Sequence, residues 1–175
     1  MANYHESTRQ RYATPMESPS PKRRRLLLVY AGHPGGRTEA LRRAVEAGVQ
    51  AFDTGIELTS RHALDCGPDD LLRAEGILLG TPEHFGYMAG ALKDFFDRTY
   101  YPVEGKTQGL PYALFISAGN DGSGAQRSVE RIVTGYGWTA VAPALIAIGA
   151  PDESVLQQAY ALGATLAAGL EAGIF

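Results

Sequence analysis

"LLLVYAGHPGGRTEALRRAVEAGVQ", residues 26–50, contains the pattern that decides the fold. Its first six residues form an uninterrupted apolar run, which is typical of a strand buried on both faces of a parallel sheet. From Thr38 onward, apolar residues recur at helical spacing with charged residues between them. A buried strand, a short glycine-containing loop and a helix together predict one unit of an open α/β sheet.

The same alternation continues through the rest of the chain and predicts five strands with helices between them. The further strands are expected at residues 56–59, 76–80, 112–117 and 139–148. Further helices are expected at 69–73, 88–99, 123–136 and 151–170. Ser123 and Gln126 have the spacing of a capping box, and Pro151 with two following acidic residues favours the start of the last helix. The expected architecture is a parallel sheet of order 2-1-3-4-5 with helices on both faces.

Composition sets limits on the class of protein. With 175 residues, 45% hydrophobic and 20% charged, the chain is long enough for one domain with a substantial core. Cys66 is the only cysteine, which excludes an internal disulfide and a multi-cysteine zinc site. No apolar stretch approaches the ~20 residues of a membrane span, and no secretory signal is recognised. We therefore expect a cytoplasmic protein with no membrane partner.

The first 25 residues differ from the rest in charge. They contain six basic and two acidic residues, about +4, which leaves about −7 on the remainder. They are polar and carry Pro and Ser without periodicity, so we predict a flexible basic arm at 1–25 and one domain at 26–175. The acidic domain argues against nucleic-acid binding, and the basic cluster at 22–25 is expected to be a solvated flank of the first strand.

Three loops follow the first, third and fourth predicted strands, at residues 32–38, 81–87 and 117–122. In the expected sheet these loops meet at the carboxyl edge, where open α/β sheets bind ligands. The first, "GHPGGRT", places small residues, Arg37 and Thr38 at a helix start, which favours an anion. It lacks the lysine of a P-loop and the G-x-G-x-x-G dinucleotide fingerprint, so a simple glycine-rich turn remains an alternative.

Other side chains that could bind a metal or act in catalysis have simpler explanations. His33 and His84 have no third residue at metal-ligand spacing, so no metal is expected. Cys66 beside Gly67 and Pro68 is expected to be a loop residue, and Ser123 lacks the Gly-x-Ser-x-Gly context of an esterase.

The chain resembles the flavodoxin-like flavoproteins, specifically the small NAD(P)H-dependent FMN reductases and the tryptophan-repressor-binding-protein-like quinone reductases. The resemblance extends over residues 26–175. It is strongest in "GTPEHFGYMAGALKDFFDR", beginning at Gly80, and is supported by "ISAGNDGSGA", beginning at Ile116. It implies a flavodoxin-like three-layer sandwich with a five-stranded parallel sheet.

The resemblance implies that the first loop binds the FMN phosphate and that the other two flank the isoalloxazine ring. The cofactor-binding residues expected on this basis are His33, Gly35, Gly36, Arg37, Thr38, Thr81, Pro82, Glu83, His84, Phe85, Gly86, Ser117, Ala118, Gly119, Asn120, Asp121 and Gly122. The first loop differs from the Thr-rich loop of ordinary flavodoxins. His33 and Gly35 replace two hydroxyl residues, and only Thr38 is kept.

The function implied is electron transfer from NAD(P)H through FMN to a quinone or similar small acceptor, without a catalytic side chain. Two alternatives remain open: a flavodoxin-type electron carrier and a flavin-free interaction protein. The helix after the second loop is implied to form a homodimer or homotetramer. Leu92, Phe96, Tyr100 and Tyr101 would supply apolar area for that contact.

Overall fold

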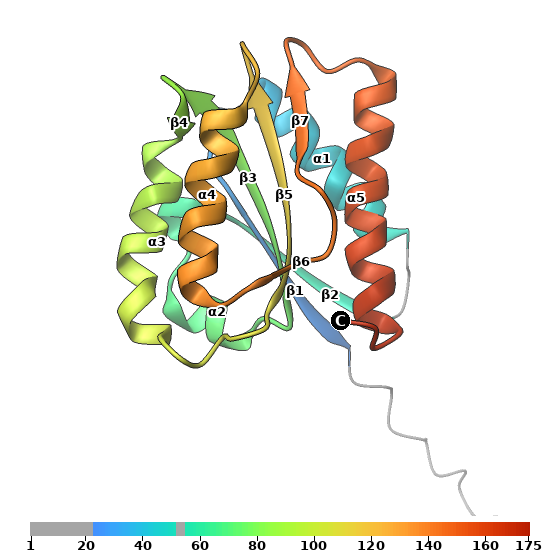
Figure 1. The fold of residues 1–175 in the computed structure, drawn as a ribbon. Coiled ribbons are helices and arrows are strands. Elements are labelled where there is room, and N and C mark those ends of the chain that lie inside the picture. Colours follow the sequence, from blue (N-terminus) through green and yellow to red (C-terminus); the bar gives the residue numbers. More distant parts are fainter. Residues whose placement is uncertain (1–22, 52–54) are drawn as a thin grey trace, which may run out of the picture.

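A sheet made mostly of parallel strands runs through the middle of the molecule (Figure 1). The computed structural model describes residues 23–51 and 55–175. Within them the sheet has seven strands: β1 Arg24–Tyr30, β2 Ile56–His62, β3 Gly76–His84, β4 Tyr87–Met88, β5 Pro111–Ala118, β6 Thr139–Ala140 and β7 Leu145–Ile148. The helices are α1 Arg37–Gln50, α2 Pro68–Arg73, α3 Gly90–Val103, α4 Ser123–Tyr136 and α5 Glu153–Glu171, with a 3₁₀ turn at Ala63–Asp65.

The strand order confirms the predicted fold class. The order is β2-β1-β3-β5-β6, in which β5 is the fourth of the five predicted strands. The predicted fifth strand is split, because β6 pairs with the start of β5 and β7 pairs with its end. The short β4 is the one antiparallel addition, pairing with the end of β3.

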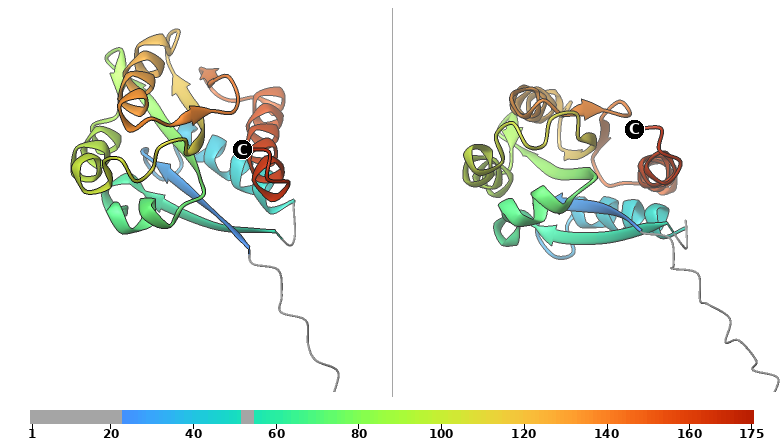
Figure 2. Two further views of the ribbon diagram at one scale, coloured as in Figure 1. Left: turned by 60° about the horizontal axis from the view of Figure 1, so that its bottom comes forward. Right: turned by 90° about the horizontal axis from the view of Figure 1, so that it is seen from below.

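Alternate residues of the central strands pack on opposite faces of the sheet, as period-two geometry requires. Leu26 and Leu28 of β1 belong to a core with α1 and α5, whereas Leu27 and Val29 belong to a core with α2, α3 and α4. Seen from below, the helices lie on the two sides of the sheet (Figure 2). Since both faces are covered, the central strands are continuously apolar.

The N-terminal boundary differs slightly from expectation. Strand β1 begins at Arg24, where the Arg24 guanidinium pairs with the Glu75 carboxylate at 2.9 Å. Residues 24 and 25 are therefore part of the sheet, and the remainder of the predicted arm, up to residue 22, lies outside the described residues.

The expectation for Phe96 is wrong. Its side chain is 1% exposed and packs on Tyr136 and Trp138, with ring centroids 5.8 and 6.3 Å away. Tyr136 at the end of α4 and Trp138 just after it thus pack against the ring that we expected at a subunit contact. Leu92, expected at the same contact, is likewise fully buried. On α3, Tyr100 is half-buried and Tyr101 is 78% exposed.

Candidate functional site

The three predicted loops follow β1, β3 and β5, which are neighbours in the sheet. Parallel strands place their carboxyl ends on one edge, so the loops adjoin one another at the upper end of the molecule in Figure 1. This is the position at which ligands bind in open α/β sheets.

The first loop leaves the start of α1 open to an anion. Gly32 and Gly35 have φ angles of 150° and 74°, and Gly36 donates its N–H to the His33 carbonyl at 3.0 Å. Gly36 is the N-cap of α1 and provides no side-chain cap. The N–H groups of the first helical turn are consequently uncapped by a side chain, and the helix dipole favours negative charge there.

A carboxylate of the same chain already contacts this loop. The Gly35 N–H donates to the Glu39 carboxylate, whose other oxygen accepts from Arg43 Nη2 at 2.8 Å. The Gly35 N–H and the Arg43 guanidinium lower the pKa of Glu39, because both stabilise its ionised form. Glu39 is not among the residues expected from the sequence to bind the cofactor. The available signal was an acidic residue in the first helical turn, four residues after a loop glycine.

Two side chains join the first loop to the third. The hydroxyl groups of Thr38 and Ser117 are 2.7 Å apart and buried, and Arg37 Nη1 donates to the Ala118 carbonyl at 3.3 Å. The structure thus brings these four predicted residues together. It also shows that the Thr38 hydroxyl bonds within the protein.

The second predicted loop is largely a β-hairpin. Strand β3 continues to His84 and turns at Phe85 and Gly86, whose φ angles are 52° and 70°. Positive φ at both turn residues suits a two-residue hairpin, although it is uncommon for phenylalanine. The Phe85 side chain is fully exposed at the tip. Below the tip, the buried Thr81 hydroxyl accepts from the Ala89 N–H at 3.0 Å and fixes the return of the chain.

Glu83 connects this hairpin to the start of α4. Its Oε1 accepts from the Gly124 and Ala125 N–H groups at 3.1 and 3.2 Å, and Oε2 accepts from the Gly122 N–H at 3.2 Å. A carboxylate at a helix N-terminus interacts favourably with the dipole. Glu83 therefore positions two of the loops through its bonds to the protein itself.

The third loop exposes Gly119, Asn120 and Asp121. The Asp121 carboxylate accepts from the Ser123 N–H and hydroxyl, both at 3.0 Å, and these bonds lower its pKa. The predicted Ser123–Gln126 capping box is wrong. Helix α4 begins with Gly122 as N-cap, so Ser123 is one position too late to cap it.

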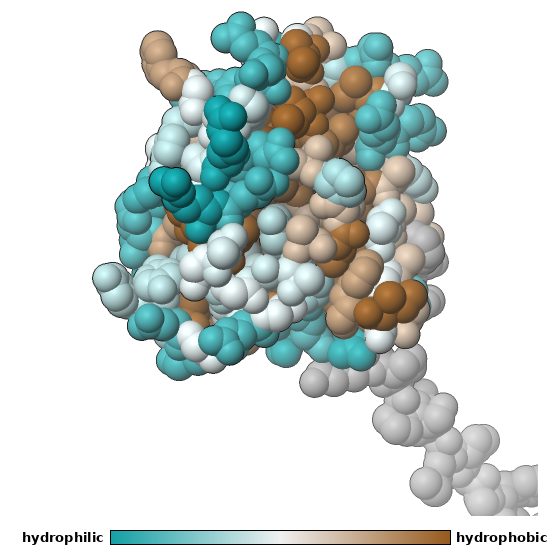
Figure 3. Space-filling model, viewed as in Figure 1, coloured by the Kyte–Doolittle hydropathy of each residue, from teal (hydrophilic) through white to brown (hydrophobic). Residues whose placement is uncertain are grey.

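The surface around these loops is not uniformly polar. An apolar strip, defined as Val141, Ala142, Leu145, Ile146 and Ile148, is partly exposed along β7 and the segment before it. Figure 3 shows apolar surface running over this region between α4 and α5. The strip reaches the third loop, where Gly149 donates its N–H to the Ala118 carbonyl at 2.9 Å.

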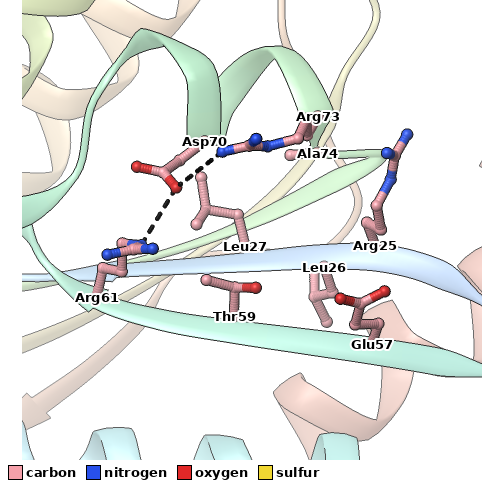
Figure 4. A pocket seen from close by; sticks show the side chains of 9 residues that line it. All are labelled: Arg25, Leu26, Leu27, Glu57, Thr59, Arg61, Asp70, Arg73 and Ala74. Carbon is pink, nitrogen blue, oxygen red and sulfur yellow. Dashed lines mark ion pairs between the residues drawn. The ribbon is translucent and has the colours of Figure 1, made fainter.

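Two hollows lie near the β1–β2 side of the sheet. The one in Figure 4, about 400 Å³, is bounded by β1, β2 and α2, and it contains an Arg61–Asp70 ion pair of 3.2 Å. It lies beneath the short α2, away from the three loops. A second of about 250 Å³ adjoins the first loop and is lined by Tyr30, Gly32, His33, Pro34, Glu39 and His62.

In residues 23–51 and 55–175 no three His, Cys, Asp or Glu side chains are grouped to hold a metal ion. None of the helices in this part of the chain has both the length and the apolarity needed to cross a membrane.

Comparison with known proteins identifies the architecture. A flavodoxin from the domain Archaea superimposes with a TM-score of 0.72 and 25% identity, over 84% of this chain and 99% of that one. The chain has the flavodoxin fold. A WrbA-like flavodoxin from Agrobacterium tumefaciens shares this fold at 20% identity and a TM-score of 0.66, over 87% of this chain and 99% of that one.

Within this flavodoxin-like chain, residues 68–151 match the family model of the NADPH-dependent FMN reductases. A segment of 70 residues is 40% identical to the quinone-oxidoreductase QR2 of Triphysaria versicolor, covering 38% of this chain and 33% of that relative. The chain thus matches about a third of the length of this curated relative. The predicted resemblance to flavodoxin-like FMN reductases is confirmed.

Proposed function

We propose that this protein binds FMN at the three loops and transfers electrons from NAD(P)H to a quinone or a similar small acceptor. The observation that carries the proposal is the uncapped start of α1, joined to the third loop by the Thr38–Ser117 hydrogen bond of 2.7 Å. Backbone donors that would suit a phosphate thus adjoin the loops that would flank a flavin ring.

The residues present fit FMN in two respects. Uncapped N–H groups and the exposed Arg37 supply donors and positive charge for a phosphate monoester. The fully exposed Phe85 supplies an aromatic face for a planar ring system. A large apolar side chain held in solvent at positive φ is costly, and contact with a ring would remove that exposed area from water.

The flavin, when bound, supplies the hydride and electron chemistry, and the chain supplies binding, orientation and shielding. The first turn of α1 and Arg37 would hold the phosphate. The hairpin tip would cover one side of the ring, while Asn120 and the backbone at Gly119 offer donors and an acceptor for polar ring atoms. Glu83 would hold the hairpin and the third loop in fixed positions relative to one another through its hydrogen bonds to the start of α4.

The names of similar proteins favour the donor and acceptor that we propose. The matching family model is of NADPH-dependent FMN reductases, and the Triphysaria versicolor relative is a quinone oxidoreductase. The apolar strip beside the third loop would provide a surface for an apolar acceptor close to the ring.

A flavodoxin-type electron carrier is the second candidate, because a flavodoxin shares the fold over 84% of the chain. Such a carrier would bind FMN and exchange electrons with a partner, without turning over a small substrate. A reductase would oxidise NAD(P)H over many catalytic cycles with a small acceptor, whereas a carrier would not.

The decisive experiment combines an absorbance spectrum with a turnover assay. We expect visible flavin bands after addition of FMN and gel filtration, and multiple turnovers of NADPH or NADH with a soluble quinone. Arg37→Ala should weaken FMN binding, whereas Arg73→Ala on α2 should not. Binding without turnover would favour the carrier, and failure to bind FMN would overturn both functions.

A further inference from the structure

Glu39 occupies one donor of the loop that we assign to phosphate. The Gly35 N–H donates to one carboxylate oxygen, so the loop contains a negative group of the chain itself. The contact lies at the N-terminal end of α1, where an external anion would also be favoured.

We infer that Glu39 is an internal competitor for the phosphate group, which must displace its carboxylate from Gly35. This inference rests on the proposed FMN function and specifies how the same loop discriminates between ligands. A phosphate dianion and a carboxylate repel one another at the few-ångström separation that the loop imposes. Riboflavin has no phosphate and would not be repelled by Glu39.

The surroundings of Glu39 allow its carboxylate to leave the loop without losing all of its partners. Its second oxygen accepts from Arg43 at 2.8 Å and lies 3.5 Å from Arg42 Nη2. The Arg43 side chain is 70% exposed and can follow a rotation of the glutamate. When the Glu39 carboxylate leaves Gly35, water replaces that hydrogen bond and the ion pairs with Arg42 and Arg43 remain.

Arg42 is fixed more firmly and keeps Glu39 close to the loop. Its guanidinium carbon lies 4.8 Å from the Tyr30 ring centroid, and it also pairs with Glu46 one turn further along α1. The side chains of Arg42, Glu39 and Glu46 are each less than a fifth exposed. The negative charge of Glu39 consequently stays near the phosphate site even after displacement.

The experiment compares Glu39→Gln with Glu46→Gln. Glutamine at 39 keeps the shape and an acceptor for Gly35 but removes the charge, whereas Glu46 pairs with Arg42 and does not contact the loop. We expect Glu39→Gln to tighten FMN binding about tenfold and to leave riboflavin binding unchanged. Glu46→Gln should change neither. Flavin fluorescence quenching gives both affinities.

A second readout uses inorganic phosphate and does not depend on the flavin ring. In ¹H–¹⁵N spectra the Gly35 amide should shift on addition of phosphate, at lower phosphate concentration in Glu39→Gln than in the parent protein. Glu39→Ala, which removes the acceptor entirely, should behave like Glu39→Gln. Thermal unfolding of each variant checks that the fold is retained.

The outcomes separate this inference from the proposed function. If FMN binds equally well to the parent and to Glu39→Gln, or more weakly to the variant, Glu39 does not compete and the inference is overturned while FMN binding stands. If neither protein responds to FMN or phosphate, the phosphate loop itself is wrong and the proposed function fails with it. A gain for riboflavin as large as that for FMN would also overturn the competition with phosphate.

Discussion

The carboxylate of Glu83 lies 3.1 Å from the backbone nitrogen of Gly124, so a residue at the end of β3 caps the start of α4. The two segments are in such close contact that a Cβ on Gly124 would lie 2.0 Å from the carbonyl oxygen of Gly86. The end of β3 and the start of α4 are thus joined by one acidic side chain and packed closely at one glycine.

Replacing Glu83 should therefore destabilise both the helix start and the site. We expect Glu83→Ala to lower stability by about 2 kcal/mol, because three backbone N–H groups lose a charged acceptor. The thermal midpoint should fall by about 4–8 °C, and FMN binding should weaken. Thermal unfolding by circular dichroism measures the first effect. Glu104→Ala, at an exposed position after α3, is the control and should leave the midpoint unchanged.

The Thr38–Ser117 hydrogen bond should show coupling in a double-mutant cycle. Thr38→Val keeps the shape but leaves the buried Ser117 hydroxyl without this partner, at a cost of about 1–3 kcal/mol. Thr38→Val combined with Ser117→Ala should cost less than the sum of the single changes, by about 1 kcal/mol. Urea unfolding of the four proteins gives the cycle. Strict additivity would mean that the bond does not contribute to stability.

Two helical glycines should respond in opposite ways to alanine. A Cβ on Gly48 of α1 would lie 2.0 Å from the Tyr160 carbonyl oxygen of α5, so Gly48→Ala should cost about 1–3 kcal/mol. A Cβ on Gly135 of α4 meets only the Tyr100 ring at 3.8 Å. Gly135→Ala should stabilise the protein by up to about 1 kcal/mol through helix propensity. The same sign of change in urea unfolding for both variants would contradict the packing argument.

Cys66 should make the stability sensitive to alkaline pH. Burial raises the pKa of its thiol from an ordinary 9.0 to about 12, and the nearby Asp70 adds to the effect. Above pH 9 the unfolded chain loses this proton while the folded chain retains it, so stability falls as the pH rises toward 12. Below pH 9 the thiol is protonated in both the folded and the unfolded chain, so it does not make stability depend on pH.

The check is urea unfolding at several pH values between 8 and 11. Cys66→Ala should flatten the decline above pH 9, although the variant is less stable overall because it loses buried volume. Parallel curves for the two proteins would show that the thiol titrates normally in the fold.

We propose that α3 takes part in self-association through Tyr101 rather than Phe96. Tyr101 is 78% exposed, so Tyr101→Glu should lower the assembly state without unfolding the chain. Phe96→Glu places a charge in the core and should abolish folding instead. Light scattering with circular dichroism distinguishes the two results. A monomeric parent protein would contradict the proposal.

The sequence alone was enough for the layered architecture, because that architecture depends on local periodicity. Continuous apolar runs such as residues 26–31 indicated strands covered on both faces. The acidic residues after Pro151 indicated the last helix, which begins at Glu153 with Asp152 as its N-cap, two residues later than expected. The position of the loops at one sheet edge followed from the alternation of strands and helices.

Only the tertiary structure showed the hydrogen-bond and packing partners that lie far apart in the sequence. Sequence spacing suggested Ser123 as a cap, but the acceptor for the start of α4 is Glu83, forty-one residues before Gly124. Phe96 had the helical position of an interface residue, yet Tyr136 and Trp138 surround it. The Glu39 contact with Gly35 was also missed. Periodicity specifies which face of an element is apolar, whereas hydrogen-bond partners depend on how separate elements meet in three dimensions.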